Sequence, residues 1–175
     1  RLSLVGSEMC IRDRANMHWG LEYERIPSRE QRELADWLMR QGVDLVIGSH
    51  PHVVQPMVLR RGKEGVPDRL VVYSLGNFIS NMSREHTDGG VMVKVVLGRK
   101  GLRRYIASAQ YSLIYSSRYK NEQGKEDIRV VPAASWSGKN QNSSFSVDSA
   151  LIKYVNNTRL FLKGNNKEVE EYIFE

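Results

Sequence analysis

The histidines of this sequence are the side chains whose spacing most suggests chemistry. His18 lies in the segment MHWG, and His50 and His52 lie in the segment GSHPHVVQP. Side chains two positions apart leave the same face of an extended segment, and Pro51 favours an extended backbone between the two histidines. Neutral imidazole rings offer nitrogen lone pairs, which suits zinc, manganese or iron. The spacing therefore predicts a metal-binding cluster, with a purely structural His-x-His pair as the alternative.

The elements around these histidines indicate an α/β fold. We expect His18 to end a strand, residues 27–42 to form a helix, and residues 43–48 to form a short strand buried on both faces. A helix followed by a buried strand is half of a β-α-β unit. Such folds keep their sites at the carboxyl ends of parallel strands, which is where both histidine segments lie. His86 lies in a polar loop, and we expect it at the surface.

The helix over residues 27–42 has clear start and stop signals. Pro27 and Ser28 favour its first turn, and Gly42 favours its end. One apolar stripe should face the core. The residues expected on or beside that stripe are Leu34, Ala35, Leu38, Met39 and Gln41.

The pattern changes to antiparallel strands further along the chain. A hairpin is expected around Gly98–Gly101, followed by polar loops near residues 120–127 and 138–146. Ser146 should cap a last helix. We divide the chain into residues 1–14, residues 15–120 as the main domain, and residues 121–175 as a C-terminal extension.

The first fourteen residues resemble the translation of a transposase-type sequencing adapter over LVGSEMCIRDR (Leu4–Arg14). We therefore expect them to be foreign to the protein and Ala15 to be the first native residue. The single cysteine, Cys10, falls in this segment, so residues 15–175 hold no thiol that could ligate a metal or form a disulfide.

Composition narrows the classes of protein. The chain is 41% hydrophobic and 26% charged, which indicates a globular protein rather than a disordered one. No stretch approaches the roughly 18 apolar residues of a membrane span, and no nucleic-acid motif is present. The net charge of +6 comes from lysines and arginines scattered over expected turns, which favours solvated surface, with attraction to an anionic partner as the alternative.

Four blocks of the sequence together resemble a known family. HWGLEY, the P-x-x-x-Q helix start, GVDLVIGSHPHVVQP and VVYSLGNFI are similar in order and spacing to the CapA (PGA_cap) family of bacterial capsule and poly-γ-glutamate synthesis. The resemblance covers about residues 17–97. Ser49 stands where many members have another histidine.

The resemblance implies a fold and a site. The family is similar to calcineurin-like metallophosphatases, which implies the C-terminal half of an α/β/β/α sandwich, followed by a β-rich tail and a C-terminal helix. It implies a site for two divalent metal ions, with His18, His50 and His52 as metal ligands or, for one of them, a proton donor. The remaining motif positions, for which substrate contact, loop support or packing all stay open, are Trp19, Glu22, Gln55 and Asn77.

The chain departs from the superfamily pattern in one respect. In this superfamily the first half supplies a Gly-Asp motif, a bridging carboxylate and an Asn-His motif, and none of the three is found before His18. Asp36 is expected on the helix and Asp44 at the far end of its strand, so we expect no carboxylate beside the histidines. A two-metal site needs such a group, because it offsets the repulsion between the two cations.

Three interpretations of function follow. The first is a metal-dependent hydrolase acting on a phosphoester or an anionic polymer in the full-length parent, with the present chain inactive. The second is a non-catalytic surface protein that binds or exports an anionic polymer. The third is a fragment that does not fold alone, because strands that should pair with Met17 and residues 43–48 are missing. By resemblance, the parent is extracytoplasmic and held to the membrane by an N-terminal anchor; its oligomeric state stays open.

Overall fold

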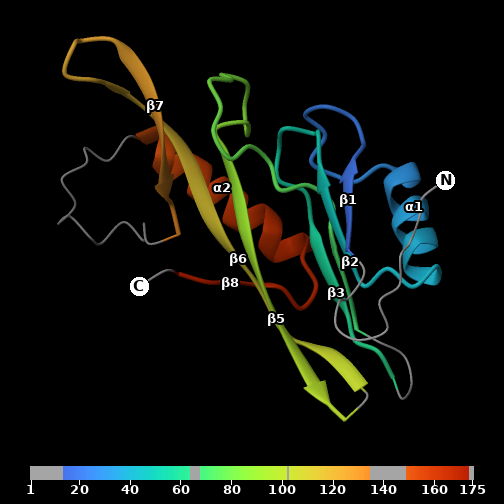
Figure 1. Ribbon diagram of the computed structural model, residues 1–175. Helices are drawn as coiled ribbons and strands as arrows, with labels where there is room; N and C mark the ends of the chain where they lie inside the picture. Colours follow the sequence, from blue (N-terminus) through green and yellow to red (C-terminus); the bar gives the residue numbers. More distant parts are fainter. Residues whose placement is uncertain (1–13, 64–67, 102, 135–148, 174–175) are drawn as a thin grey trace.

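The computed structural model describes residues 14–63, 68–101, 103–134 and 149–173. These residues form two β-sheets and two α-helices, which confirms the predicted α/β class (Figure 1). Residues 1–13 of the adapter-like segment, the predicted polar loop near residues 138–146 and its Ser146 lie outside the described residues. Within the described residues, neither helix combines the length and the apolar character that a membrane crossing requires.

The first sheet is built around the parallel pair β1 and β2. Its order is β1-β2-β4-β3, with β1 at Arg14–His18, β2 at Leu45–Ser49, β4 at Arg69–Val72 and β3 at Met57–Arg60. Strands β1, β2 and β4 are parallel, and β3 is antiparallel to β4. The expectation of missing partners is wrong for residues 43–48, because β2 lies between β1 and β4. Met17 pairs with Gly48, but β1 forms an edge of this sheet and pairs only with β2 among the described strands.

Helix α1 (Arg29–Arg40) connects β1 to β2 and begins as predicted. Ser28 is its N-cap, and a capping box closes the first turn: the Gln31 N–H donates to Ser28 Oγ (3.2 Å), and the Ser28 N–H donates to Gln31 Oε1 (2.9 Å). Gly42 lies just past the helix with φ of +100°, a conformation that favours glycine.

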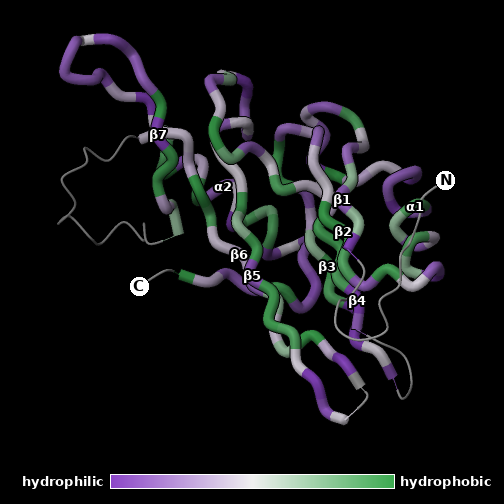
Figure 2. Tube along the Cα trace, viewed as in Figure 1, coloured by the Kyte–Doolittle hydropathy of each residue, from purple (hydrophilic) through white to green (hydrophobic). Residues whose placement is uncertain are grey.

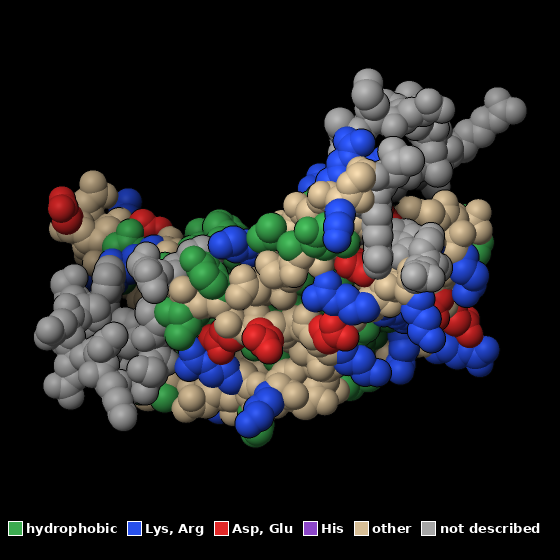
Figure 3. Space-filling model, turned by 90° about the horizontal axis from the view of Figure 1, so that it is seen from below, with side chains coloured by type: hydrophobic (Ala, Val, Ile, Leu, Met, Phe, Trp, Pro, Cys, Tyr) green, Lys and Arg blue, Asp and Glu red, His purple; other side chains and the backbone are tan. Residues whose placement is uncertain are grey.

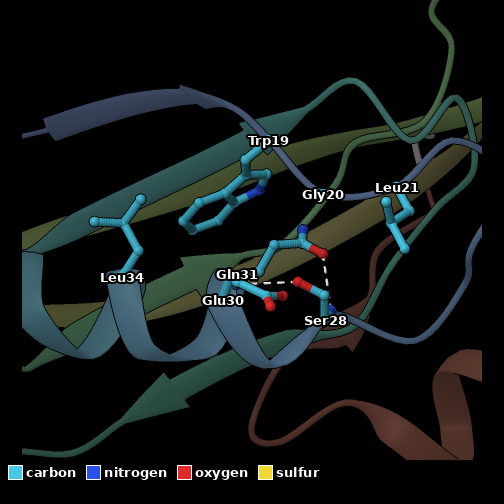
Figure 4. Close-up of a pocket in the computed structure, with 7 residues that line it drawn as sticks. All are labelled: Trp19, Gly20, Leu21, Ser28, Glu30, Gln31 and Leu34. Atoms are coloured by element: carbon cyan, nitrogen blue, oxygen red, sulfur yellow. Dashed lines mark hydrogen bonds between the residues drawn. The ribbon is translucent and has the colours of Figure 1, made fainter.

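The buried face of α1 differs from the predicted stripe. Gln31, Ala35 and Met39 are buried, whereas Leu34 is 39% exposed. The helix turns a row of i, i+4 positions toward the sheet, and that row includes a glutamine because Gln31 has a buried partner there. Leu34 lies beside Trp19 in a shallow pocket at the edge of the helix, as Figure 4 shows.

A long hairpin dominates the second sheet. It contains β5 (Gly89–Lys100), β6 (Arg103–Lys120), β7 (Glu126–Pro132) and the short β8 (Glu170–Glu171), with β5, β7 and β8 all paired to β6. The predicted hairpin near Gly98–Gly101 and the polar turn before β7 are confirmed. Helix α2 (Ser149–Asn165) confirms the predicted C-terminal helix and packs with both sheets.

Apolar side chains form one core on each face of the first sheet. The larger core joins both sheets and α2, through residues such as Met57, Leu113 and Leu162. The smaller core lies between the first sheet and α1. Strand β2 contributes to both, with Val46 in the smaller core and Ile47 against the larger one, as predicted for a strand covered on both faces. In Figure 2 the hydrophobic residues accordingly follow the middle of the strands.

The two sheets are joined where β5 begins. The Val91 N–H donates to the Leu75 carbonyl (2.8 Å), and the Asn77 N–H donates to the Gly89 carbonyl (3.0 Å). A side chain at Gly90 could not fit, because its Cβ would lie 2.5 Å from the Leu75 oxygen. This close approach places the segment after β4, including Asn77, beside the carboxyl edge of the first sheet.

Charged side chains are mixed rather than gathered by sign on the face seen in Figure 3. Lysines and arginines lie among aspartates and glutamates there, and no histidine is visible on that face. Among the described residues, opposite charges also pair directly, as in Arg60–Asp36 (2.7 Å) and Arg61–Glu168 (2.9 Å). The arrangement agrees with the interpretation of the basic residues as solvated surface.

Two buried glutamines connect α1 to the loop that carries the histidines. Gln31 Nε2 donates to Gln55 Oε1 (2.8 Å), and Gln55 Nε2 donates to the Glu24 carbonyl (2.8 Å). Both side chains are almost completely buried, so their polar atoms must find partners within the protein, and the bond between the two amides provides one for each. Figure 4 shows the bond between Ser28 and Gln31. Together these bonds connect the start of α1 to the loop that contains Glu24 and to the loop that contains Gln55.

We predict that Gln31→Ala lowers the free energy of unfolding by about 1–3 kcal/mol, because it leaves Gln55 Oε1 and the Ser28 N–H without partners. Gln41→Ala is the matched control at the exposed end of the same helix and should change stability by less than about 0.5 kcal/mol. Urea unfolding followed by circular dichroism measures both. Equal effects of the two substitutions would contradict the role given to the buried amides.

Candidate metal centre

The parallel pairing of β1 and β2 brings two histidines together. His18 ends β1 opposite Ser49, the last residue of β2, and His50 follows directly. The Trp19 N–H continues the ladder by donating to the Ser49 carbonyl (3.2 Å). The rings of His18 and His50 consequently lie with their centroids 4.4 Å apart. As predicted, both segments meet at the carboxyl edge of the sheet.

The backbone at His50 and His52 is not extended, so that part of the prediction is wrong. His50 has φ of +100° and His52 has φ of +61°, both in the left-handed region. The Tyr23 N–H donates to the Pro51 carbonyl (2.7 Å), which ties this turn to the loop after β1. The turn still keeps the rings close, with 6.1 Å between the centroids of His50 and His52.

Glu22 supplies the carboxylate that we expected to be missing. Ligand atoms of Glu22, His50 and His52 all lie within 4.8 Å of one another, and Glu22 Oε1 is 4.0 Å from His52 Nε2. Glu22 comes from the loop between β1 and α1 rather than from an upstream strand. The signal was present in HWGLEY, but the sequence pattern does not show that this loop folds back over the second histidine segment.

The two aspartates considered earlier lie elsewhere. Asp36 is on α1, where its carboxylate pairs with Arg60 (2.7 Å). Asp44 precedes β2, at the opposite end of that strand from His50. Both positions agree with the prediction for these residues.

The donor set suits a divalent transition metal. Neighbouring ligand atoms bound at about 2.1 Å to one tetrahedral ion are about 3.4 Å apart, so the 4.0 Å between Glu22 Oε1 and His52 Nε2 would have to shorten on metal binding. Imidazole and carboxylate ligands together suit zinc, manganese or iron. Glu22 is exposed, so its side chain is free to move toward the two histidines.

Asn77 determines which nitrogen of His52 faces Glu22. Asn77 Nδ2 donates to the Thr87 carbonyl (3.0 Å), so Asn77 Oδ1 is the atom turned toward His52 Nδ1, at 3.0 Å. An amide oxygen only accepts, so His52 Nδ1 carries a proton, and in the neutral ring Nε2 then keeps the lone pair. Two electron-pair donors, His52 Nε2 and Glu22 Oε1, therefore face each other, which is an arrangement that a cation stabilises.

An aromatic layer covers one side of the cluster. The Tyr23 ring stacks on His52, with centroids 6.1 Å apart, and the Arg84 guanidinium lies 4.0 Å from the centre of the Tyr23 ring. Desolvation, and then a hydrogen bond to Glu22, raise the pKa of Tyr23 above its ordinary value. The phenol therefore stays protonated at neutral pH, and Arg84 places a positive charge next to the site.

The other predicted site residues support the loops. Trp19 is buried, stacks on Tyr73 and donates from Nε1 to the Tyr73 carbonyl (2.8 Å), so packing rather than ligand stacking describes it. This contact needs Gly48, since a Cβ there would lie 2.4 Å from Trp19 Nε1. Gln55 is occupied in the buried amide pair described above.

His86 is half-buried rather than at the surface as predicted. Burial, followed by the nearby charge of Arg25, lowers the pKa of His86 below its usual range. It does not belong to the group of metal-ligand candidates found among the described residues.

We predict that Asn77→Leu abolishes the preference of His52 for the Nδ1–H form and weakens metal binding about 10- to 100-fold, the usual effect of removing such a supporting bond. Proton–nitrogen correlation spectra of the histidine rings report the tautomer directly. Asn81→Leu is the control, because no hydrogen bond joins the Asn81 side chain to His52. A wild-type spectrum with the proton on Nε2 would contradict this assignment.

Comparison with known proteins supports the family resemblance. The family described as bacterial capsule synthesis protein PGA_cap matches residues 15–82. The PGA biosynthesis protein CapA of Bacillus subtilis (strain 168) is 34% identical over 88 residues, which is 50% of this chain and 22% of that protein. The capsule biosynthesis protein CapA of Bacillus anthracis is 36% identical over 86 residues, 49% of this chain and 20% of that protein.

The family match over residues 15–82 includes Glu22, His50 and His52, the three residues of the cluster. The chain spans about a fifth of the length of these two relatives. No solved structure matched the chain. Residues 15–82 thus match the PGA_cap family of bacterial capsule synthesis proteins, and about half of the chain is similar to two CapA proteins of that kind.

Proposed function

We propose that Glu22, His50 and His52 bind a divalent metal ion, with His18 beside them, in a hydrolase-like site of metallophosphatase type. The observation that supports this most directly is the pair formed by His52 Nε2 and Glu22 Oε1, two electron-pair donors 4.0 Å apart. The ions considered are manganese, zinc and iron. A second ion in the full-length parent would need ligands from residues beyond this cluster.

The residues in and around the cluster would have different roles in the reaction. A bound divalent cation polarises a phosphoryl oxygen and lowers the pKa of a bound water. His18 is exposed and lies against His50, so it can give a proton to, or take one from, an oxygen of the substrate. Arg84 offers a positive charge for an anionic group of the substrate. Tyr23 and Asn77 hold the His52 ring from its face and its edge.

The context of this activity is proposed from the relatives. One of them is named for PGA biosynthesis and the other for capsule biosynthesis. We propose that the full-length protein acts in capsule or poly-γ-glutamate synthesis on a phosphoester or an anionic polymer. We further propose an extracytoplasmic location with a membrane anchor outside the present chain.

A second candidate function is non-catalytic binding or export of an anionic polymer. One observation favours it: the cluster found among the described residues offers three ligand candidates, Glu22, His50 and His52, which is enough for one ion but not for the two ions of a two-metal hydrolytic site. A site for one ion can hold an anion without hydrolysing it.

Metal binding is tested by titrating the protein with Mn²⁺ and Zn²⁺ by calorimetry. We expect one ion per chain, and we expect Glu22→Gln, His50→Gly and His52→Gly each to weaken binding more than tenfold. Glycine is the chosen replacement because both histidines have positive φ, which glycine adopts without strain. His86→Gly is the matched control, since His86 also has positive φ but lies outside the cluster. Unchanged affinity in the His50→Gly, His52→Gly double variant would rule the site out.

Hydrolysis separates the two candidate functions. The enzyme interpretation predicts metal-dependent cleavage of bis(p-nitrophenyl) phosphate by the full-length protein, lost in His52→Gly, and little or none by the present chain. The binding interpretation predicts no cleavage by either protein, together with metal-dependent retention of poly-γ-glutamate. Cleavage that persists in His52→Gly would contradict both.

A further inference from the structure

A groove of about 530 Å³ adjoins the metal-ligand cluster and is not explained by it. One wall is formed by His52, Asn77 and the loop at residues 79–82. The other wall is formed by residues 126–128 at the start of β7. Because His52 belongs both to the groove and to the cluster, a molecule held at the metal would extend into this groove.

Both walls of the groove are attached to strand β6. The Ser80 N–H donates to Ser116 Oγ (3.2 Å), and the Arg118 guanidinium donates to the carbonyls of Asn81 (2.5 Å) and Met82 (3.3 Å). The opposite wall pairs with β6 through the β6–β7 ladder. The groove is therefore formed before any ligand arrives, as binding sites for small molecules usually are.

The lining of the groove favours hydrogen-bond donors over anions. Glu126 and Asp127 place two carboxylates in one wall, and no lysine or arginine is among the lining residues in the described part of the chain. Asp127 accepts bonds from Tyr119 (3.4 Å) and from the Ile128 N–H (2.8 Å), whereas Glu126 is exposed to a ligand. Two cations of β6 adjoin this wall: Arg118 is turned to backbone carbonyls of the loop, and Lys120 lies opposite Glu126 in the β6–β7 ladder.

Apolar and neutral polar groups complete the lining. Ile79 is 58% exposed and lies in one wall, and Ile128 lies in the other. Ser80 and Asn81 add a hydroxyl and an amide between them. Apolar surface interrupted by hydroxyl, amide and carboxylate acceptors suits a chain that presents both carbon–hydrogen faces and hydroxyl or ammonium donors, as saccharide units do.

We propose that this groove is a subsite for an uncharged or cationic saccharide part of the substrate, recognised through its hydroxyl or ammonium donors, with Glu126 as the residue that rejects anionic units. This proposal rests on the proposed function in one respect: it assumes that the reacting group of the substrate lies at the metal cluster. An anionic group of the substrate would then lie at the cluster and Arg84, and the groove would hold the part without negative charge.

Binding of four tetrasaccharide-sized probes to the metal-free chain in EDTA tests this subsite without any catalytic readout. The probes are the tetramers of glucosamine, N-acetylglucosamine, galacturonate and γ-glutamate, followed through the backbone amide signals of Asn81 and Glu126 by NMR. We expect the two probes without carboxylates to shift these signals and the two carboxylate-bearing probes to leave them in place. Binding of both uncharged and cationic probes identifies hydroxyl recognition, and binding of glucosamine alone identifies ammonium recognition.

The role of Glu126 is tested by Glu126→Gln, with Glu122→Gln in the turn before β7 as the matched control. We expect Glu126→Gln to weaken glucosamine tetramer binding about two- to fivefold, the range of an exposed ion pair, and to let the galacturonate tetramer bind. Glu122→Gln should change neither affinity.

Three results would overturn the proposal: no shift with any probe, galacturonate or γ-glutamate binding as tightly as glucosamine, or equal effects of the two substitutions. The saccharide titrations contain no metal. If the metal titration fails, the proposed function is contradicted, but the saccharide titrations still test the groove.

Discussion

The parallel register of β1 against β2 is the constraint on which the rest of the site depends. It sets His18 opposite Ser49, so that the next residue, His50, meets the His18 ring. Every later contact follows from this edge: the loop after β1 can reach Pro51, and Glu22 can reach His52. The pairing is itself held in place by packing on both faces of β2, since Val46 and Ile47 enter different cores. The positions of the cluster residues therefore depend on the packing of the two cores against β2.

The order and type of elements could be predicted from the sequence because their signals are local. Ser28 and Gly42 bound α1, and the apolar run in β2 indicates a strand covered on both faces. The positions of His18 and His50 at strand ends follow from the same patterns. The resemblance to a family rested on motif order, and the matched residues 15–82 contain all the motifs used.

The remaining features depend on contacts between distant segments, which periodicity does not encode. The left-handed turns at His50 and His52 flank Pro51, whose carbonyl accepts a bond from Tyr23, almost thirty residues earlier. Glu22 joins the histidines for the same reason. The exposure of Leu34 follows from the Gln31–Gln55 bond, in which a polar residue occupies a place that a hydrophobic pattern assigns to an apolar one. The groove is built by strands whose pairing brings β7 next to the loop after β4.

The left-handed backbone at His50 and His52 has a consequence for how this loop can change. A non-glycine residue in such a conformation costs of the order of 1–3 kcal/mol, and glycine would relieve that cost at either position. At these two positions folding stability therefore favours glycine, whereas a role for the imidazole ring requires histidine. Variants selected for thermal stability alone should therefore gain glycine at these positions. If both histidines were kept under such a selection, a requirement other than folding stability would be acting on them.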